Sequence, residues 1–91
     1  MPESPCVHVE FFGIPRERAG VAETRVDSRT IGDALQALAR RYPRLAESCF
    51  DAHGLKAAYT MNLNGDRFVT DLATPLADGD RLLVLSADAG G

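Results

Sequence analysis

The chain has 91 residues, of which 45% are hydrophobic and 25% charged, the composition of one globular domain and not of a disordered or fibrous chain. A chain of this length buries too little surface to enclose a large active-site cleft. Its formal net charge is −3 and its basic residues are scattered along the sequence, so we expect neither a nucleic acid nor a membrane surface as a partner.

The sequence shows neither a targeting signal nor a pair of closely spaced cysteines. The N-terminal stretch MPESPCVHVE is acidic where a signal peptide is basic, and no window approaches eighteen apolar residues, which predicts a cytoplasmic protein. The two cysteines, Cys6 and Cys49, lack the C-x-x-C spacing of a zinc or redox site. We therefore expect both to be small hydrophobic residues of the core.

The first part of the chain alternates in two places. Residues 6–12 predict a half-buried strand, and residues 22–27 predict a second strand that forms a hairpin with the first. Between them, residues 13–20 are rich in glycine and proline and are predicted as a turn. The side chains expected to face inward are Val7, Val9 and Phe11 on the first strand and Ala22, Thr24 and Val26 on the second, with Phe12 on the other face.

A helix is predicted to begin at Thr30, whose hydroxyl can accept a hydrogen bond from the amide of Asp33. Pro43 marks its end, and a shorter helix over residues 44–50 is expected next, before residues 51–54 break the pattern. The apolar stripe of the long helix consists of Ile31, Leu35, Leu38 and Tyr42.

The remaining elements are predicted to be strands. Residues 59–63 alternate, and residues 67–70 return as a short strand after Asn64-Gly65, a pair typical of a tight hairpin because both residues tolerate positive φ. A turn at residues 78–80 then leads into a last strand over residues 81–85.

This order of elements predicts an α+β fold of the β-grasp type, with a mixed sheet of four or five strands packed on one main helix. A right-handed crossover can place the last strand parallel to the first, in the middle of the sheet. We expect a single domain over residues 1–85 and a flexible C-terminal tail over residues 86–91 that ends in Gly-Gly.

The last strand has large apolar side chains on both of its faces. Alternation sends Leu82 and Val84 to the core and sends Leu83 and Leu85 to the open face of the sheet, where Phe12 should also lie. An apolar patch on that face predicts a contact surface for a partner. The alternative is that a loop folds over it.

No catalytic pattern accompanies these elements. The two histidines have no acid or nucleophile partner in the sequence, no hydrolase, metalloprotease or nucleotide-loop motif occurs, and the dispersed carboxylates predict no metal site. The chemically distinctive group is the α-carboxylate of Gly91. Because Gly90 and Gly91 have no Cβ, the chain end can thread a narrow channel and present that carboxylate to another protein. We therefore expect a carrier or non-catalytic subunit, not an enzyme.

Five blocks that span nearly the whole chain carry a family resemblance. They are FFGIPRERAG at 11–20, TIGDALQALARRYP at 30–43, LNGDRF at 63–68, TPLADGD at 74–80 and the final AGG. Together they resemble the MoaD and ThiS families of ubiquitin-like sulfur carriers. The first block is closer to MoaD, the small subunit of molybdopterin synthase, and the segment RLAESCFDAHGLKAAYT also resembles the MoaD-like carrier of bacterial cysteine biosynthesis.

The resemblance implies that Gly91 is adenylated by an ATP-dependent, E1-like activating enzyme and then converted to a thiocarboxylate that donates sulfur. It also implies that Gly90 lines the threading channel, and that Phe12 and Leu85 occupy positions that face partners in the MoaD family. No bound cofactor is implied, because the activating enzyme uses the ATP. The implied acceptor is the large molybdopterin synthase subunit or another sulfur-accepting enzyme.

Several interpretations stay open beside a carrier for molybdopterin synthesis. The sulfur could instead serve cysteine, thiamine or another metabolite. The chain could be a ubiquitin-like modifier that forms an isopeptide through Gly91, with Lys56 as its single lysine. It could also be a structural or regulatory subunit with a disordered tail.

The residues just before Gly-Gly depart from the family pattern. The family usually has one or two prolines there, which stiffen the tail, whereas residues 86–89 read SADA. Asp88 also places a negative charge three residues from the carboxylate.

Overall fold

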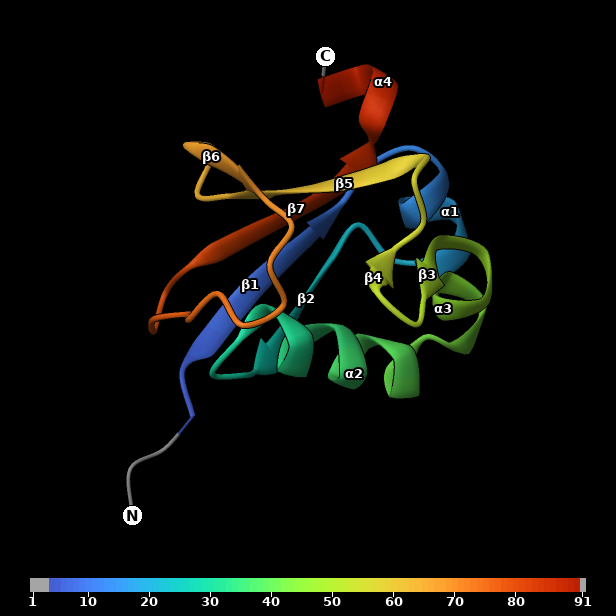
Figure 1. The fold of residues 1–91 in the computed structure, drawn as a ribbon. Helices are drawn as coiled ribbons and strands as arrows, with labels where there is room; N and C mark the ends of the chain where they lie inside the picture. Colours follow the sequence, from blue (N-terminus) through green and yellow to red (C-terminus); the bar gives the residue numbers. More distant parts are fainter. Residues whose placement is uncertain (1–3, 91) are drawn as a thin grey trace.

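Strand β7 (Arg81–Ser86) runs through the middle of a five-stranded sheet in the computed structural model, which describes residues 4–90. The strand order is β2-β1-β7-β5-β6, and helix α2 (Ile31–Arg41) crosses one face of the sheet (Figure 1). The other strands of this sheet are β1 (Cys6–Phe11), β2 (Glu23–Asp27), β5 (Tyr59–Leu63) and β6 (Arg67–Val69). The described chain also contains α1 (Ile14–Ala19), α3 (Pro43–Cys49), α4 (Ala87–Gly90), and the paired strands β3 (Phe50–Asp51) and β4 (Gly54–Leu55).

The sheet is mixed because β7 runs parallel to β1 and antiparallel to β5. At its two sides, β1 pairs with β2 and β5 pairs with β6, both antiparallel. The prediction that the last strand lies parallel to the first in the middle of the sheet is confirmed. The α+β class and the β-grasp arrangement around one main helix are confirmed with it.

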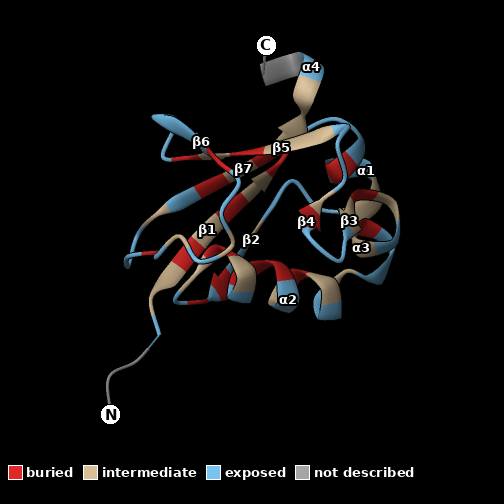
Figure 2. Ribbon diagram, in the orientation of Figure 1, coloured by how far each residue is buried: buried red, intermediate tan, exposed pale blue. Residues whose placement is uncertain are grey.

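The core lies between α2 and the face of the sheet that this helix covers (Figure 2). Tyr42, just after α2, is half-buried, and its ring meets Phe11 edge-on with 5.9 Å between the ring centroids. The predicted stripe of α2 and the inward face of β1 are thus confirmed. The buried side chains of these elements and of β7 are Ile31, Ala34, Leu35, Leu38, Val7, Val9, Phe11, Leu82 and Val84.

The inward face of β2 was predicted less well. Val26 is buried, but Thr24 is only half-buried, and Ala22 is exposed and lies before the strand begins. The first half of β2, an edge strand, lies near the C-terminal end of α2, where Arg41 donates a hydrogen bond to Oγ1 of Thr24 at 2.9 Å.

Helix α2 is capped as predicted, since Oγ1 of Thr30 accepts from the amide of Asp33 at 3.2 Å. The first two amides of the helix donate instead to the carbonyl oxygens of Thr74 and Leu72, at 3.0 and 2.9 Å. Amides in the first turn have no partner within a helix. The loop before β7 therefore satisfies them and is held against the start of α2.

The segment predicted as a turn at residues 13–20 is a helix, α1. Gly13 and Gly20 lie at its two ends with φ angles of 60° and 79°, and the amide of Gly20 closes the last turn by donating to the carbonyl of Arg16 at 3.0 Å. Pro15 occupies the first turn, where its missing N–H is not needed. The glycines marked boundaries, and six residues are too few for helical periodicity to show.

Helix α3 begins one residue earlier than predicted and ends one residue earlier. Pro43, expected to mark the end of α2, is also the first residue of α3, a position that suits proline. The predicted break at residues 51–54 contains the turn between β3 and β4, where Oδ1 of Asp51 accepts from the amide of His53 at 2.8 Å.

Asn64 and Gly65 join β5 to β6 with φ angles of 62° and 71°, which confirms the predicted hairpin turn. Strand β7 runs one residue further than predicted, because Ser86, expected in the tail, pairs with Tyr59. Within residues 4–90, no helix is long and apolar enough to cross a membrane.

Candidate functional site

Leu83 and Leu85 lie, as predicted, on the face of the sheet that points away from α2. Both are half-buried, whereas Leu82 and Val84 between and before them are fully buried. Phe12 extends the pairing of β1 with β7 by one residue, since its amide donates to the carbonyl of Val84 at 3.0 Å. The structure therefore brings the three predicted apolar contact residues together on one face.

Phe68 belongs to the same face and was not predicted. It pairs with Asn62 of β5, which in turn pairs with Leu83 of β7. The next residue, Val69, is buried, so alternation turns the ring of Phe68 to the open side. That Phe68 shares a face with Leu83 depends on which strands are paired, so no local pattern predicts it. We call Phe12, Phe68, Leu83 and Leu85 the open-face patch.

The exposure of Phe12 and Phe68 distinguishes an open contact surface from a patch covered by a loop. Phe12 is 42% exposed and Phe68 is 52% exposed. No loop of the described chain covers these rings, so the alternative in which a loop folds over the patch is wrong for them. Exposed aromatic side chains that flank half-buried leucines are typical of a surface that contacts another protein.

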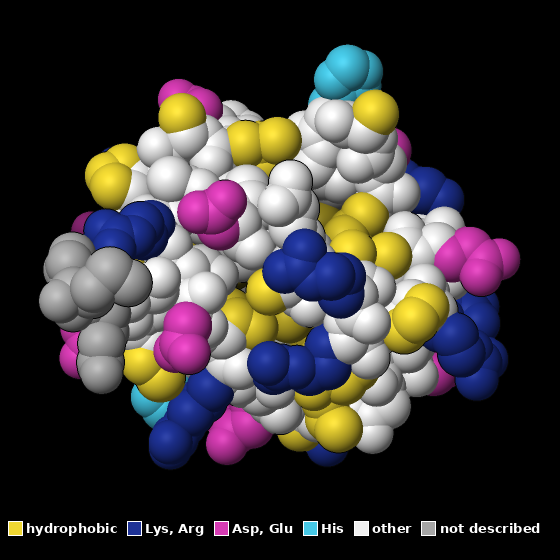
Figure 3. All heavy atoms as spheres, turned by 90° about the horizontal axis from the view of Figure 1, so that it is seen from below, with side chains coloured by type: hydrophobic (Ala, Val, Ile, Leu, Met, Phe, Trp, Pro, Cys, Tyr) yellow, Lys and Arg dark blue, Asp and Glu magenta, His cyan; other side chains and the backbone are white. Residues whose placement is uncertain are grey.

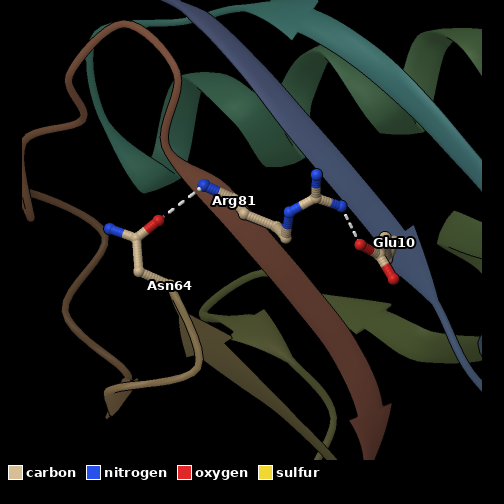
Figure 4. A network of polar contacts seen from close by, with 3 residues as sticks. All are labelled: Glu10, Asn64 and Arg81. Atoms are coloured by element: carbon tan, nitrogen blue, oxygen red, sulfur yellow. Dashed lines mark hydrogen bonds and ion pairs between the residues drawn. The ribbon is translucent and has the colours of Figure 1, made fainter.

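The open face is charged near the beginning of β7. Arg81 reaches across to Glu10 of β1, and the two form an ion pair (Figure 4). The backbone amide of Arg81 donates to Oδ1 of Asn64 at 2.8 Å, and Nδ2 of Asn64 donates to Oδ1 of Asp80 at 3.0 Å. The ion pair is partly exposed and contributes about 1 kcal/mol at most. The contacts of Asn64 hold the first residue of β7 in place.

The C-terminal arm, residues 87–91, leaves the sheet at the other end of β7. Ser86 is held by its pairing with Tyr59, and the amide of Ala87 donates to the carbonyl of Ala58 at 2.9 Å. Helix α4 then carries the chain beyond the end of the sheet (Figure 1). The central strand thus fixes where the arm begins.

Gly91, predicted to react, and Gly90, predicted to line the channel, are the last two residues of this arm in the sequence. Gly90 is the last residue of α4, and Gly91 lies outside the described residues. Asp88 is exposed. Because Leu85 is two residues from the start of the arm, the open-face patch adjoins the point from which the arm extends.

A buried thiol lies behind the start of the arm. Tyr59, the partner of Ser86, lies near the thiol of Cys49 of α3, and each group affects the pKa of the other. Burial raises the pKa of the fully buried Cys49 thiol, and partial burial together with Cys49 raises the pKa of Tyr59. Both groups keep their protons at neutral pH. Cys49 is the core residue predicted, whereas Cys6 is only half-buried.

The helical side of the molecule is built differently. Figure 3 views the molecule from the α2 side, where basic, acidic and apolar side chains are mixed. A hollow of about 440 Å³ is lined there by α2, α3, the β3–β4 turn and Leu72, and none of its lining residues belongs to β7 or to the open-face patch. Residues 4–90 contain no group of three or more His, Cys, Asp or Glu side chains that could hold a metal ion.

A mixed sheet that wraps one helix, with an arm that leaves its central strand beside an apolar patch, defines a ubiquitin-like β-grasp protein. The model of the ThiS family matches residues 9–91, and the chain therefore belongs to this family of ubiquitin-like sulfur carriers and modifiers. No curated protein sequence matches the chain.

Solved structures of several relatives share the fold. SAMP1, the small archaeal modifier protein 1 of Haloferax volcanii, is 31% identical over 94% of this chain and 99% of its own, with a TM-score of 0.79. CysO of Mycobacterium tuberculosis is 27% identical over 89% and 98%, with a TM-score of 0.76. A chain from the complex of subunits 1 and 2 of the molybdopterin-converting factor of Helicobacter pylori is 26% identical over 94% and 99%, with a TM-score of 0.63.

Proposed function

We propose that this chain is a cytoplasmic sulfur carrier that serves molybdopterin synthesis as the small subunit of the synthase. The observation that carries the proposal is the placement of the arm: helix α4 leaves the central strand next to the open-face patch, and the sequence that follows its first residues is Ala89-Gly90-Gly91. Membership of the ThiS family and the similarity to the molybdopterin-converting factor complex support it.

The chemistry proceeds in two steps on the carboxyl group of Gly91. An E1-like activating enzyme binds ATP, the carboxylate attacks the α-phosphate, pyrophosphate leaves, and an acyl-adenylate forms. A donor at the oxidation level of hydrosulfide then attacks the acyl carbon, AMP leaves with its electron pair, and a thiocarboxylate remains. Adenylation is needed because a free carboxylate is a poor electrophile. The carrier itself holds no cofactor in this scheme.

The open-face patch supplies the binding energy that the arm lacks. Ordering a glycine-containing arm in a channel costs conformational entropy, which compensating contacts must offset. Phe12 and Phe68 expose large rings for this purpose, and Leu83 and Leu85 lie between them. The activating enzyme and the large synthase subunit would each bind this face while the arm reaches the active site.

Intact-mass spectrometry tests the proposal directly. After incubation with the activating enzyme of the same genome, ATP and a sulfide donor, we expect the mass gain of one oxygen replaced by sulfur, located at Gly91 by fragmentation. A variant that lacks Gly90 and Gly91 should show no gain. Absence of the gain in the intact chain would contradict the proposal, and unchanged function of the truncated chain would favour a purely structural subunit.

The pathway that receives the sulfur needs a separate measurement. We expect the thiocarboxylate form to bind the large molybdopterin synthase subunit and to convert its substrate to molybdopterin. Binding to a cysteine synthase, with formation of cysteine, would instead assign the carrier to the pathway that the likeness to CysO suggests.

A second candidate function is protein modification, which the similarity to SAMP1 favours. In that case an amine, and not a sulfur nucleophile, attacks the acyl carbon of the adenylate; AMP leaves, the nitrogen loses a proton, and an amide forms at Gly91. Self-conjugation at a lysine would require Lys56, which is exposed and whose Nζ donates to the carbonyl of Glu47 at 2.9 Å. Isopeptide-linked conjugates on a tagged chain in cells would support this function, and their absence would count against it.

A further inference from the structure

We propose that Asp88 determines which activating enzyme accepts the arm, and that this enzyme places a basic side chain opposite Asp88. The inference rests on the proposed function, because it concerns the channel through which Gly91 reaches ATP. It adds a chemical property of the partner that neither the fold nor the family membership supplies.

The arm is slender at every position but one. Its sequence is ADAGG, so each residue other than Asp88 has a methyl group or a single hydrogen as its side chain. Methyl groups and hydrogens can fit a narrow channel, but they offer its walls no charge and no hydrogen bond. Any recognition of an arm side chain by charge or by hydrogen bonding therefore falls on Asp88.

Asp88 lies in the first turn of helix α4, a place that suits an acidic residue, but this helix has only four residues and Asp88 has no partner side chain among residues 4–90. Its side chain is exposed, and it makes no ion pair or side-chain hydrogen bond with any other described residue. It also lies past the last strand, so it packs against no part of the core. The carboxylate is thus available to a partner.

A channel that delivers Gly91 to a phosphate must also enclose Asp88. Residues 87–90 form helix α4 in the free chain, so the arm must unwind to thread a narrow channel. An extended chain spans about 3.3–3.6 Å per residue, which places Asp88 about 10 Å behind the reacting carboxyl group in that state. Removing an unpaired carboxylate from water is strongly unfavourable, whereas pairing it with a guanidinium or ammonium group restores much of the loss. An activating enzyme that binds this arm tightly therefore carries an arginine or lysine about 10 Å from the adenylation point.

Steady-state kinetics of adenylation test the inference. The KM of the activating enzyme for the carrier is measured by pyrophosphate release for the wild type, Asp88→Asn and Asp88→Glu. Asp88→Asn keeps the shape and removes the charge, so we expect KM to rise about tenfold or more while kcat changes less than about threefold. The KM for Asp88→Glu should stay within about threefold of the wild-type value, since glutamate keeps the negative charge.

Asp27→Asn is the matched control. Asp27 is exposed and ends β2, where it pairs with Cys6 at the beginning of β1. Because β1 and β7 are parallel, this position is at the end of the sheet opposite the arm. The same chemical change there should leave KM unaltered.

An Asp88→Asn KM equal to or below that of the wild type would overturn the inference, because it would mean that the channel offers the charge no partner. Added salt gives an independent readout, since it should raise the KM of the wild type more than that of Asp88→Asn; equal salt dependence would also contradict the inference. If the wild type forms no adenylate, the proposed function fails and this inference with it. If the wild type is active and Asp88→Asn equals it, only the inference fails.

Discussion

Adjacent leucines of β7 perform different tasks because alternation points them to opposite faces. Leu82 is 0% exposed and packs in the core, whereas Leu83 is half-buried in the open-face patch. The same residue type therefore stabilises the fold at one position and is free to contact a partner at the next. This contrast separates stability from binding within a single strand.

Truncating the two leucines should give opposite results. We expect Leu82→Ala to lower the free energy of unfolding by about 2–5 kcal/mol, as measured by urea denaturation. Leu83→Ala should lower it by about 1 kcal/mol or less but should weaken binding to the activating enzyme, as measured by calorimetry. Similar losses of stability in both variants would mean that the open face is covered in solution.

At the scale of elements, the start of α2 is joined to the loop before β7. The loop carbonyls of Leu72 and Thr74 accept from the first helical amides, and Thr30 caps the third. The helix that fills the core and the strand that carries the arm are therefore positioned by one set of hydrogen bonds.

Removing the hydroxyl cap should lower the stability of the whole domain. We expect Thr30→Ala to lower the free energy of unfolding by about 1 kcal/mol, within the 0.5–2 kcal/mol typical of helix caps. Thr30→Ser keeps an acceptor oxygen and should lose less than Thr30→Ala in the same thermal or urea unfolding experiment. Equal losses for the two variants would show that the methyl group, and not the hydrogen bond, matters.

At the scale of the molecule, the two faces of the sheet are specialised. One face packs on α2, and the other presents the open-face patch with the arm at its end. The buried Cys49 and its neighbour Tyr59 lie near the point where the arm begins. Because folding raises the pKa of both groups, their protonation affects the free energy of unfolding of the whole domain.

Stability should decrease at alkaline pH. Folding raises the pKa of Cys49 above its ordinary value of 9.0 and the pKa of Tyr59 above 10.0. Above about pH 8.5 the folded chain therefore keeps protons that the unfolded chain releases. The free energy of unfolding is unaffected by these two groups below that pH and falls as the pH rises through their raised pKa values. Cys49→Ala should give a shallower decline in the free energy of unfolding between about pH 8.5 and 11 than the wild type. An identical slope would contradict the assignment.

Local patterns were sufficient for the elements whose signals lie within a few residues. The alternation of β1 and β7, the cap at Thr30 and the Asn64-Gly65 turn were all predicted correctly. The errors fall where an element is short or where its bounds depend on pairing with a distant strand. Helix α1 is too short to show a period, and Ala22 was placed inside a strand that begins after it.

The order of the main strands and the main helix and the inward and outward leucines of β7 follow from residue type and short-range geometry, so the amino-acid pattern is enough to predict them. The position of Phe68 beside Leu83 on the open face is a tertiary feature, since it depends on the pairing of β6 with β5 and of β5 with β7. The same pairing sets the start of the arm at Ala87, because Ser86 still pairs with Tyr59 in the sheet. Alternation within a strand assigns its side chains to two faces, whereas strand pairing determines which residues of different strands lie together on one face.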